Sequence, residues 1–335
     1  MNNRIVTSFK RSDVPLEILV GPSIPKLYLY TLIDWAIYIG SAFLMFKTPY
    51  YLCPLWIIIM AGRLHAFGVI IHDLSHMKLI KKKFSIRVIE ILVGYPIGTT
   101  INAMAYHHLR HHRNTLFNND PYYNINKKCT GIQRLFLAFK KGLFFVPFWI
   151  IRSIVGIFAT FIPAVRTPYA RIFLQDVSKL DLSRHKEVIV CAREDIFLAI
   201  FHLCLFALTF QYPFLLFSYY AVIPVAGVFC IYRLLIEHEY DIVADRSVYT
   251  MIECTFDHHT SAWERILVGP RNIGYHCMHH IHPGVGLHQL PKLRDWYLEN
   301  SSYYQERYKT KKKWNWKADL FGSLNDLENK MGKDL

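Results

Sequence analysis

Residues 51–76 read YLCPLWIIIMAGRLHAFGVIIHDLSH, an apolar stretch that ends on two histidines. A helix of about 20 apolar residues crosses the hydrocarbon core of a bilayer, and Tyr51–Ile71 meets that length. His72 and His76 stand at i and i+4, so a continuing helix carries both imidazoles on one face. The stretch therefore predicts a membrane-spanning helix that brings a histidine pair to one membrane surface.

Three further stretches are apolar enough to span, and together with the first they form two pairs. Leu27–Phe46 precedes Tyr51–Ile71 across a short turn at Lys47, and Ile196–Phe210 precedes Phe214–Ile236 across the turn QYP. Such short turns allow only an antiparallel return. We expect two helical hairpins.

Two other apolar stretches are interrupted by residues that a spanning helix disfavours. Ile86–Met104 contains a glutamate, two glycines and a proline, and Leu143–Pro163 contains Arg152. We expect both to be interfacial or re-entrant segments.

Composition supports a membrane protein, because 53% of the 335 residues are hydrophobic and 15% aromatic, more than in an ordinary soluble enzyme. The formal charge of +14 comes from basic residues beside apolar segments. Anionic lipid headgroups are therefore the expected partner, and nucleic acid is not. The seven cysteines contain no CxxC pair, so neither a disulfide framework nor a thiolate zinc site is expected.

The distribution of lysine and arginine predicts the orientation in the membrane. The two hairpin turns carry one basic residue, Lys47, whereas the intervening segments carry many. Both termini and the histidine side are then cytosolic, and the N-terminus lacks the apolar core of a signal peptide. We expect a cytosolic segment at 1–26, a membrane domain at 27–300 and a basic cytosolic tail at 301–335. A compact chain without an obvious retention signal favours a bacterial inner membrane over the endoplasmic reticulum.

Three clusters with one spacing logic account for many of the 17 histidines. HDLSH carries His72 and His76, whereas HHLRHH and HCMHH each place three histidines at i, i+3 and i+4. Neutral imidazoles that converge from three helices can surround two divalent ions, and they suit iron, zinc, copper and nickel alike. The spacing predicts a dimetal site. The histidines of the second and third clusters are His108, His111, His112, His276, His279 and His280.

Two alternatives are weaker. A zinc protease needs HExxH with a glutamate beside the first histidine, and Asp73 stands there instead. A catalytic zinc also takes about three protein ligands, fewer than these clusters offer. A membrane metal transporter or sensor would place polar ligands near the bilayer midplane, whereas these histidines lie at helix ends and in the segments between helices.

HDLSH, HHLRHH and RNIGYHCMHHIHPGVGLHQLPKL resemble the three histidine boxes of the membrane fatty acid desaturases and their hydroxylase and carotenoid ketolase relatives. The resemblance covers roughly residues 25 to 300, and it extends to Asn118, Asp120 and Pro121 and to the lead WERILVGPRN. One departure is the sequence IHPGVG, whose His282 we do not count as a ligand. The resemblance implies a di-iron centre with a ninth ligand after a glutamate, which matches Glu237 and His238. The implied ligands are His72, His76, His108, His111, His112, His238, His276, His279 and His280.

The resemblance also implies an all-α integral membrane fold, in which four transmembrane helices stand in two hairpins under a cytosolic helical cap that holds the dimetal centre. The implied activity is that of an oxidoreductase, an O2-dependent desaturase that introduces a double bond into an acyl chain; hydroxylation or ketolation on the same scaffold is the alternative. Two iron ions would be the cofactor and dioxygen the co-substrate. Because the chain lacks a nucleotide-binding glycine motif and an iron–sulfur cysteine set, electrons would come from an external ferredoxin or small cytochrome.

The remaining polar residues receive secondary roles. Asp73 and Glu237 are expected to accept hydrogen bonds from ligating imidazoles, whereas Asp120 is expected to hold a turn. His107 is expected beside the site but not as a ligand, and His65 as a buried, hydrogen-bonded residue. His258 and His259 are weak candidates for the metal, and we expect structural roles for His185, His202 and His288.

Overall fold

A computed structural model describes residues 11–77, 83–117, 119–122, 131–238, 243, 245–257 and 262–310. These residues form helices and no strand; the only β feature among them is an isolated bridge between His238 and Thr255. The longer α-helices are α1 (Ile24–Lys47), α2 (Cys53–Ser75), α4 (Ile101–Asn114), α5 (Gly131–Phe161), α6 (Pro163–Phe173), α7 (Lys186–Gln211), α8 (Val222–Ile236) and α12 (Leu290–Asn300). The shorter ones are α3 (Phe84–Ile89), α9 (Val248–Cys254), α10 (Ala262–Leu267), α11 (His276–Ile281) and α13 (Ser302–Thr310).

Single turns of 3-10 or π-helix extend or connect these helices. Two π turns matter for the spans, because η3 continues α3 and η6 leads into α8. The turns are η1 (Arg11–Asp13), η2 (Tyr50–Leu52), η3 (Glu90–Gly94), η4 (Tyr95–Ile97), η6 (Leu216–Tyr220) and η7 (Pro270–Asn272).

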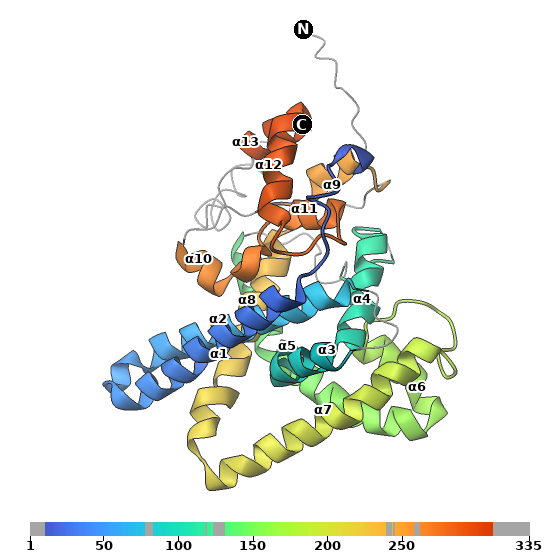
Figure 1. Cartoon of the computed structure of the whole chain (residues 1–335). Coiled ribbons are helices and arrows are strands. Elements are labelled where there is room, and N and C mark those ends of the chain that lie inside the picture. Colours follow the sequence, from blue (N-terminus) through green and yellow to red (C-terminus); the bar gives the residue numbers. More distant parts are fainter. Residues whose placement is uncertain are drawn as a thin grey trace, which may run out of the picture.

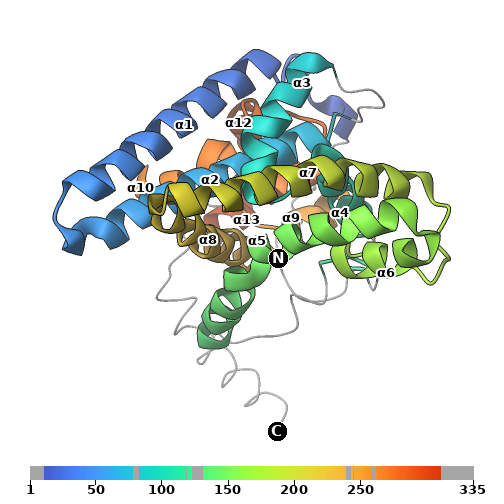
Figure 2. The same ribbon diagram turned by 90° about the horizontal axis from the view of Figure 1, so that it is seen from below.

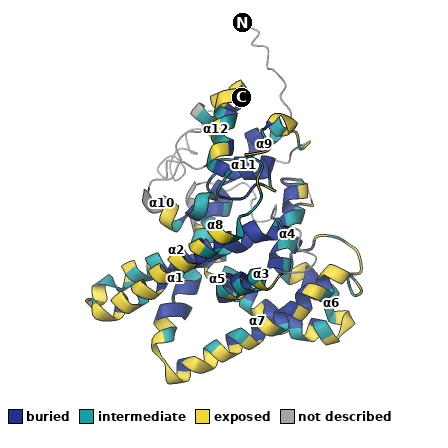
Figure 3. Cartoon of the chain, viewed as in Figure 1, coloured by how far each residue is buried: buried dark blue, intermediate teal, exposed yellow. Residues whose placement is uncertain are grey.

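The first hairpin is present as predicted. α1 and α2 pack along each other, joined only by Thr48, Pro49 and the η2 turn (Figure 1). Large apolar side chains such as Leu32, Ile39 and Phe43 stand exposed on α1. Figure 3 shows this exposed surface along α1, the far half of α2 and α7. Such extensive apolar exposure is typical of a surface that faces lipid.

The prediction of an all-helical membrane protein with four spanning helices is confirmed, but one span differs from the expected one. Within the described residues, four helices are long and apolar enough to cross a membrane: Ile24–Lys47, Tyr50–Ser75, Phe139–Phe161 and Leu216–Ile236. The expected span Ile196–Phe210 lies in α7, which is not among them, whereas most of Leu143–Pro163 lies in a helix that is.

The physical reason is a buried ion pair that the linear sequence does not reveal. Arg152 of α5 is fully buried and donates to Asp195 of α7, with Nη2 3.0 Å from Oδ1. The charge of Arg152, which argued against a spanning helix at Leu143–Pro163, is thus neutralised by a partner on another helix. Glu194 and Asp195 make α7 more polar than α5. α5 packs along both α7 and α8, as Figure 2 shows from below. The expected second hairpin is therefore a three-helix arrangement with α5 as its centre.

The interruption predicted within Ile86–Met104 is confirmed. Phe84–Ile97 and Ile101–Asn114 are apolar enough together to span, but they meet at an angle of 76°. The break falls at Gly98, whose φ of +77° lies in the left-handed region that glycine adopts without a steric cost. α4 then begins with a Thr100 cap, whose hydroxyl accepts from the Ala103 N–H, and with the Ile101 N–H bound to Glu90. This bend aims α4 at the end of α2.

A cap covers the inner ends of α2, α4 and α8. In Figure 1, α9, α11, α12 and α13 gather at the end of the molecule away from the α1–α2 turn. Their core includes Met251, Met278, Leu290 and Tyr297, and it also contains Val69 of α2. The cap thus packs directly against the spanning helix that carries the first histidine pair.

Candidate metal centre

The three histidine boxes and His238 meet where the cap covers the helix ends. α2 supplies His72 and the C-terminal His76, α4 supplies the second box, α11 the third, and His238 follows α8. All of these histidines are buried except His76, which is partly exposed. Local helix geometry explains the convergence, because i, i+3 and i+4 positions share one face.

Five histidines form the first group: His72, His76, His108, His112 and His279. Each offers one ring nitrogen, and these atoms all lie within 4.8 Å of one another. The Nε2 of His108 is 3.0 Å from that of His76 and 2.8 Å from that of His112. The His112 Nε2 is also 3.0 Å from the His279 Nε2.

The second group contains His111, His238 and His280, again with ring nitrogens within 4.8 Å of one another. The His238 Nε2 lies 3.1 Å from the Nε2 of His280 and 3.1 Å from that of His276. The two groups adjoin, since the rings of His112 and His280 are 4.4 Å apart. All nine histidines named from the sequence are therefore brought together.

Hydrogen bonds between imidazoles do not satisfy these nitrogens. A neutral Nε2 carries either one proton or one lone pair in the ring plane, yet the Nε2 atoms of His108, His112 and His238 each approach two others. When one cation binds two nitrogens at about 2.1 Å each, with an N–cation–N angle of about 90°, the two nitrogens lie about 3.0 Å apart. The side chains thus fit two metal ions, one in each group.

Burial favours the neutral form, which ligation requires, in four of these imidazoles. Burial lowers the pKa of His238 to about 3 and that of His76 to about 4. Burial, followed by neighbouring histidines, also lowers the pKa values of His276 and His280. Near neutral pH each of these four rings can offer a lone pair.

Asp120 orients His111, a role that its expected place in a turn did not include. The His111 Nδ1–H donates to Asp120 Oδ1 at 2.8 Å, so the Nε2 keeps its lone pair. That Nε2 is buried and has no hydrogen-bond partner among the described residues. Asp120 also accepts the N–H groups of Leu116 and Tyr122, which confirms the turn. Burial would raise the pKa of Asp120, but His111 and the backbone donors bring it below its usual value.

The two carboxylates expected beside the site lie differently. Glu237 Oε2 is 3.3 Å from His276 Nδ1. Asp73 Oδ1 instead accepts the Leu287 N–H at 3.3 Å, and no described histidine donates to it. Asp73 therefore links α2 to the segment that follows the third box.

The other histidines lie outside both groups. The ring nitrogens of His107, His65 and His282 bond to Tyr122 Oη, the Leu267 carbonyl and Tyr297 Oη. Asn118, His258 and His259 lie outside the described residues.

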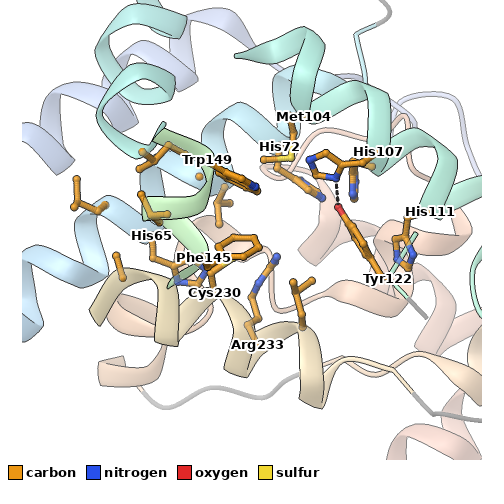
Figure 4. A pocket seen from close by; sticks show the side chains of 18 of the residues that line it. His65, His72, Met104, His107, His111, Tyr122, Phe145, Trp149, Cys230 and Arg233 are labelled. Atoms are coloured by element: carbon orange, nitrogen blue, oxygen red, sulfur yellow. Dashed lines mark hydrogen bonds between the residues drawn. The ribbon is translucent and has the colours of Figure 1, made fainter. Parts of the chain in front are cut away.

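A cavity of about 60 Å³ adjoins the histidines (Figure 4). One side is formed by His72, His108, His111 and His276. The remainder is mostly apolar and comes from α2, α4, α5 and α8, with Met104, Phe145 and Trp149 among its largest side chains. The arrangement can hold an apolar group against the histidines and exclude water from it.

Comparison with known proteins identifies a family for this chain. The fatty acid desaturase family model matches residues 48–312, a range that contains all nine histidines. A search of curated proteins gives no match.

Proposed function

The chain belongs to the fatty acid desaturase family, and from this premise we propose that it is a di-iron, O2-dependent desaturase that introduces a double bond into an acyl chain. Membership implies a membrane oxidoreductase of desaturase or hydroxylase type that acts on lipid. The iron, the dioxygen dependence and the acyl-lipid substrate are the proposed refinements.

The convergence of nine histidines carries the proposal: eight form two adjoining groups, and His276 lies beside the second. Under it, His72, His76, His108, His112 and His279 hold one ion, and His111, His238, His276 and His280 hold the other. Two bound iron ions would supply the redox chemistry that no side-chain acid or base provides for an unactivated methylene. Asp120 and Glu237 orient ligand rings, and the apolar walls at Phe145 and Trp149 hold the hydrocarbon and keep water away.

Electrons would come from a ferredoxin or small cytochrome that docks on a basic surface. The net charge of +14 favours an acidic partner. The lysine and arginine distribution supports a cytosolic site with both termini on that side.

Lipid mass spectrometry tests the proposal. Cells that express the wild type should contain a lipid lighter by two hydrogens, which is absent with His279→Ala and present with the control His288→Ala, whose residue lies outside both groups. Metal content of the purified proteins should fall in His279→Ala alone. A gain of one oxygen would replace desaturation by hydroxylation. Metal accumulation in cells without any lipid change would favour a transporter instead.

A further inference from the structure

Arg233 of α8 points into the cavity beside the histidines. In Figure 4 its guanidinium lies between Phe145 and Tyr122 and faces the open centre. The residue is 6% exposed, and its Nε and Nη1 are buried without an acceptor among the described residues. Arg233 forms an ion pair with Glu237, but the distance of 3.6 Å between Nη1 and Oε1 is too long for a hydrogen bond. Donors of a buried cation therefore face the space that a substrate would occupy.

Residues that line the same cavity carry other buried polar atoms without a partner in the described part of the chain. Outside the metal-binding histidines, these atoms are His65 Nε2, His107 Nε2 and Gln175 Oε1. The Nδ1 of His65 donates to the Leu267 carbonyl, so its Nε2 presents a lone pair. A purely hydrocarbon occupant would leave these atoms and the guanidinium desolvated and unbonded, which is unfavourable.

Charge at the site favours the same kind of occupant. Within the described residues, Asp120 and Glu237 are the carboxylates within ion-pair distance of the ligand histidines. Two divalent ions and the Arg233 guanidinium would exceed this negative charge. The partial negative charge of a carbonyl or hydroxyl oxygen in the cavity would solvate the guanidinium.

We propose that Arg233 binds a carbonyl or hydroxyl oxygen of the lipid substrate and thereby selects the carbon that faces the histidines. This inference rests on the proposed function and refines its substrate class, from any acyl chain to one oxidised near an oxygen-bearing carbon.

The position of the modification in the wild-type product is the first test. Tandem mass spectrometry of the lipid that appears on expression should place the new double bond or hydroxyl beside an oxygen-bearing part of the lipid, not in mid-chain. A modification in mid-chain, remote from any oxygen, would overturn the role of Arg233 and leave the desaturase proposal intact. The absence of any modified lipid would remove both proposals.

Variants of Arg233 provide the second test, with metal content as a readout independent of activity. Arg233→Met should keep the metal content of the wild type but lower product yield about ten- to hundredfold, the loss expected for a hydrogen bond from a charged group. Arg233→Lys should restore part of the yield. The control Arg184→Met, at an exposed site outside the cavity, should change neither product yield nor metal content.

Loss of metal from both Arg233 variants would show that the residue supports the metal centre through Glu237, contrary to the proposal. An unchanged product yield in Arg233→Met would show that the guanidinium binds water and not the substrate, which would overturn the proposal. If Arg233→Met does not fold, the product yield of Arg233→Lys and the position of the modification in the wild-type product still test the proposal.

Discussion

Arg271 reaches back 237 residues to Asp34, with its Nη2 2.7 Å from Oδ1. Arg63 donates to the same oxygen at 2.8 Å and also to the Ile266 carbonyl. Asp34 is completely buried in α1, so one carboxylate joins the first hairpin to the segment that leads into the third histidine box. Arg271 and Asn272 have φ values of 57° and 67°, a left-handed pair that this network holds in place.

Asp34→Ala should destabilise the protein by about 3–5 kcal/mol, because two buried guanidinium groups lose their shared carboxylate. Metal content should fall as well, since Arg271 precedes His276 by only five residues. The measurements are thermal unfolding in detergent and metal analysis. Asp34→Asn keeps an acceptor oxygen, so its melting temperature and metal content should lie between those of the wild type and Asp34→Ala. A normal melting temperature in Asp34→Ala would contradict the role assigned to this network.

Asp120→Ala should lower metal affinity about 10- to 100-fold, because His111 loses the acceptor that fixes its tautomer and ring orientation. Chelator competition on the purified protein measures the effect. Asp120→Asn retains an oxygen for His111 and should lose less affinity. Equal affinity in all three proteins would show that the contact does not serve the metal.

The convergence of the boxes could be predicted from the sequence because helix periodicity is local. Spacings of three and four residues place His108, His111 and His112 on one face, and the distribution of lysine and arginine predicts that the boxes share one membrane side. Assigning His238 needed the resemblance, because no spacing ties it to a box.

Contacts between distant segments could not be predicted in this way. Arg152 argued against a spanning helix until the structure paired it with Asp195, 43 residues away. Asp120 and Arg233 belong to the site only because a turn and the packing of α8 aim them there. The sequence records which charges are present but not which charges meet.

Gly227→Ala should destabilise the protein by about 1–3 kcal/mol through overpacking. α5 and α8 cross at Gly142 and Gly227, and a Cβ on Gly227 would collide with the Gly142 carbonyl. The matched control is Gly40→Ala in α1, where a Cβ meets nothing within 4 Å. The control should gain about 0.5–1 kcal/mol from the lower helix propensity of glycine. Comparison of the two melting temperatures in detergent tests the crossing, and similar shifts would show that it is not tight.

The pH dependence of stability should differ between the wild type and Asp176→Asn. Burial would raise the pKa of Asp176, but hydrogen bonds from Ser178 and Tyr106 and the charge of Arg110 bring it below its usual value of 3.8. The carboxylate is therefore stabilised in the folded state, and its contribution is complete above pH 3.8. Below that pH the unfolded chain takes up the proton first, so the contribution is lost as pH falls through the folded pKa.

Near neutral pH we expect the free energy of unfolding of the wild type to exceed that of Asp176→Asn by about 1–2 kcal/mol, the contribution of hydrogen bonds to a charged group. The difference between the two proteins should shrink steadily below about pH 3.8. Taking the difference cancels the titration of every other carboxylate, which acts equally in both. A stability difference that stays constant down to acid pH would mean that the hydrogen bonds from Ser178 and Tyr106 do not depend on the charge of Asp176. The side chain of Asp176 would then position the start of the segment between α6 and α7 without a contribution from its charge.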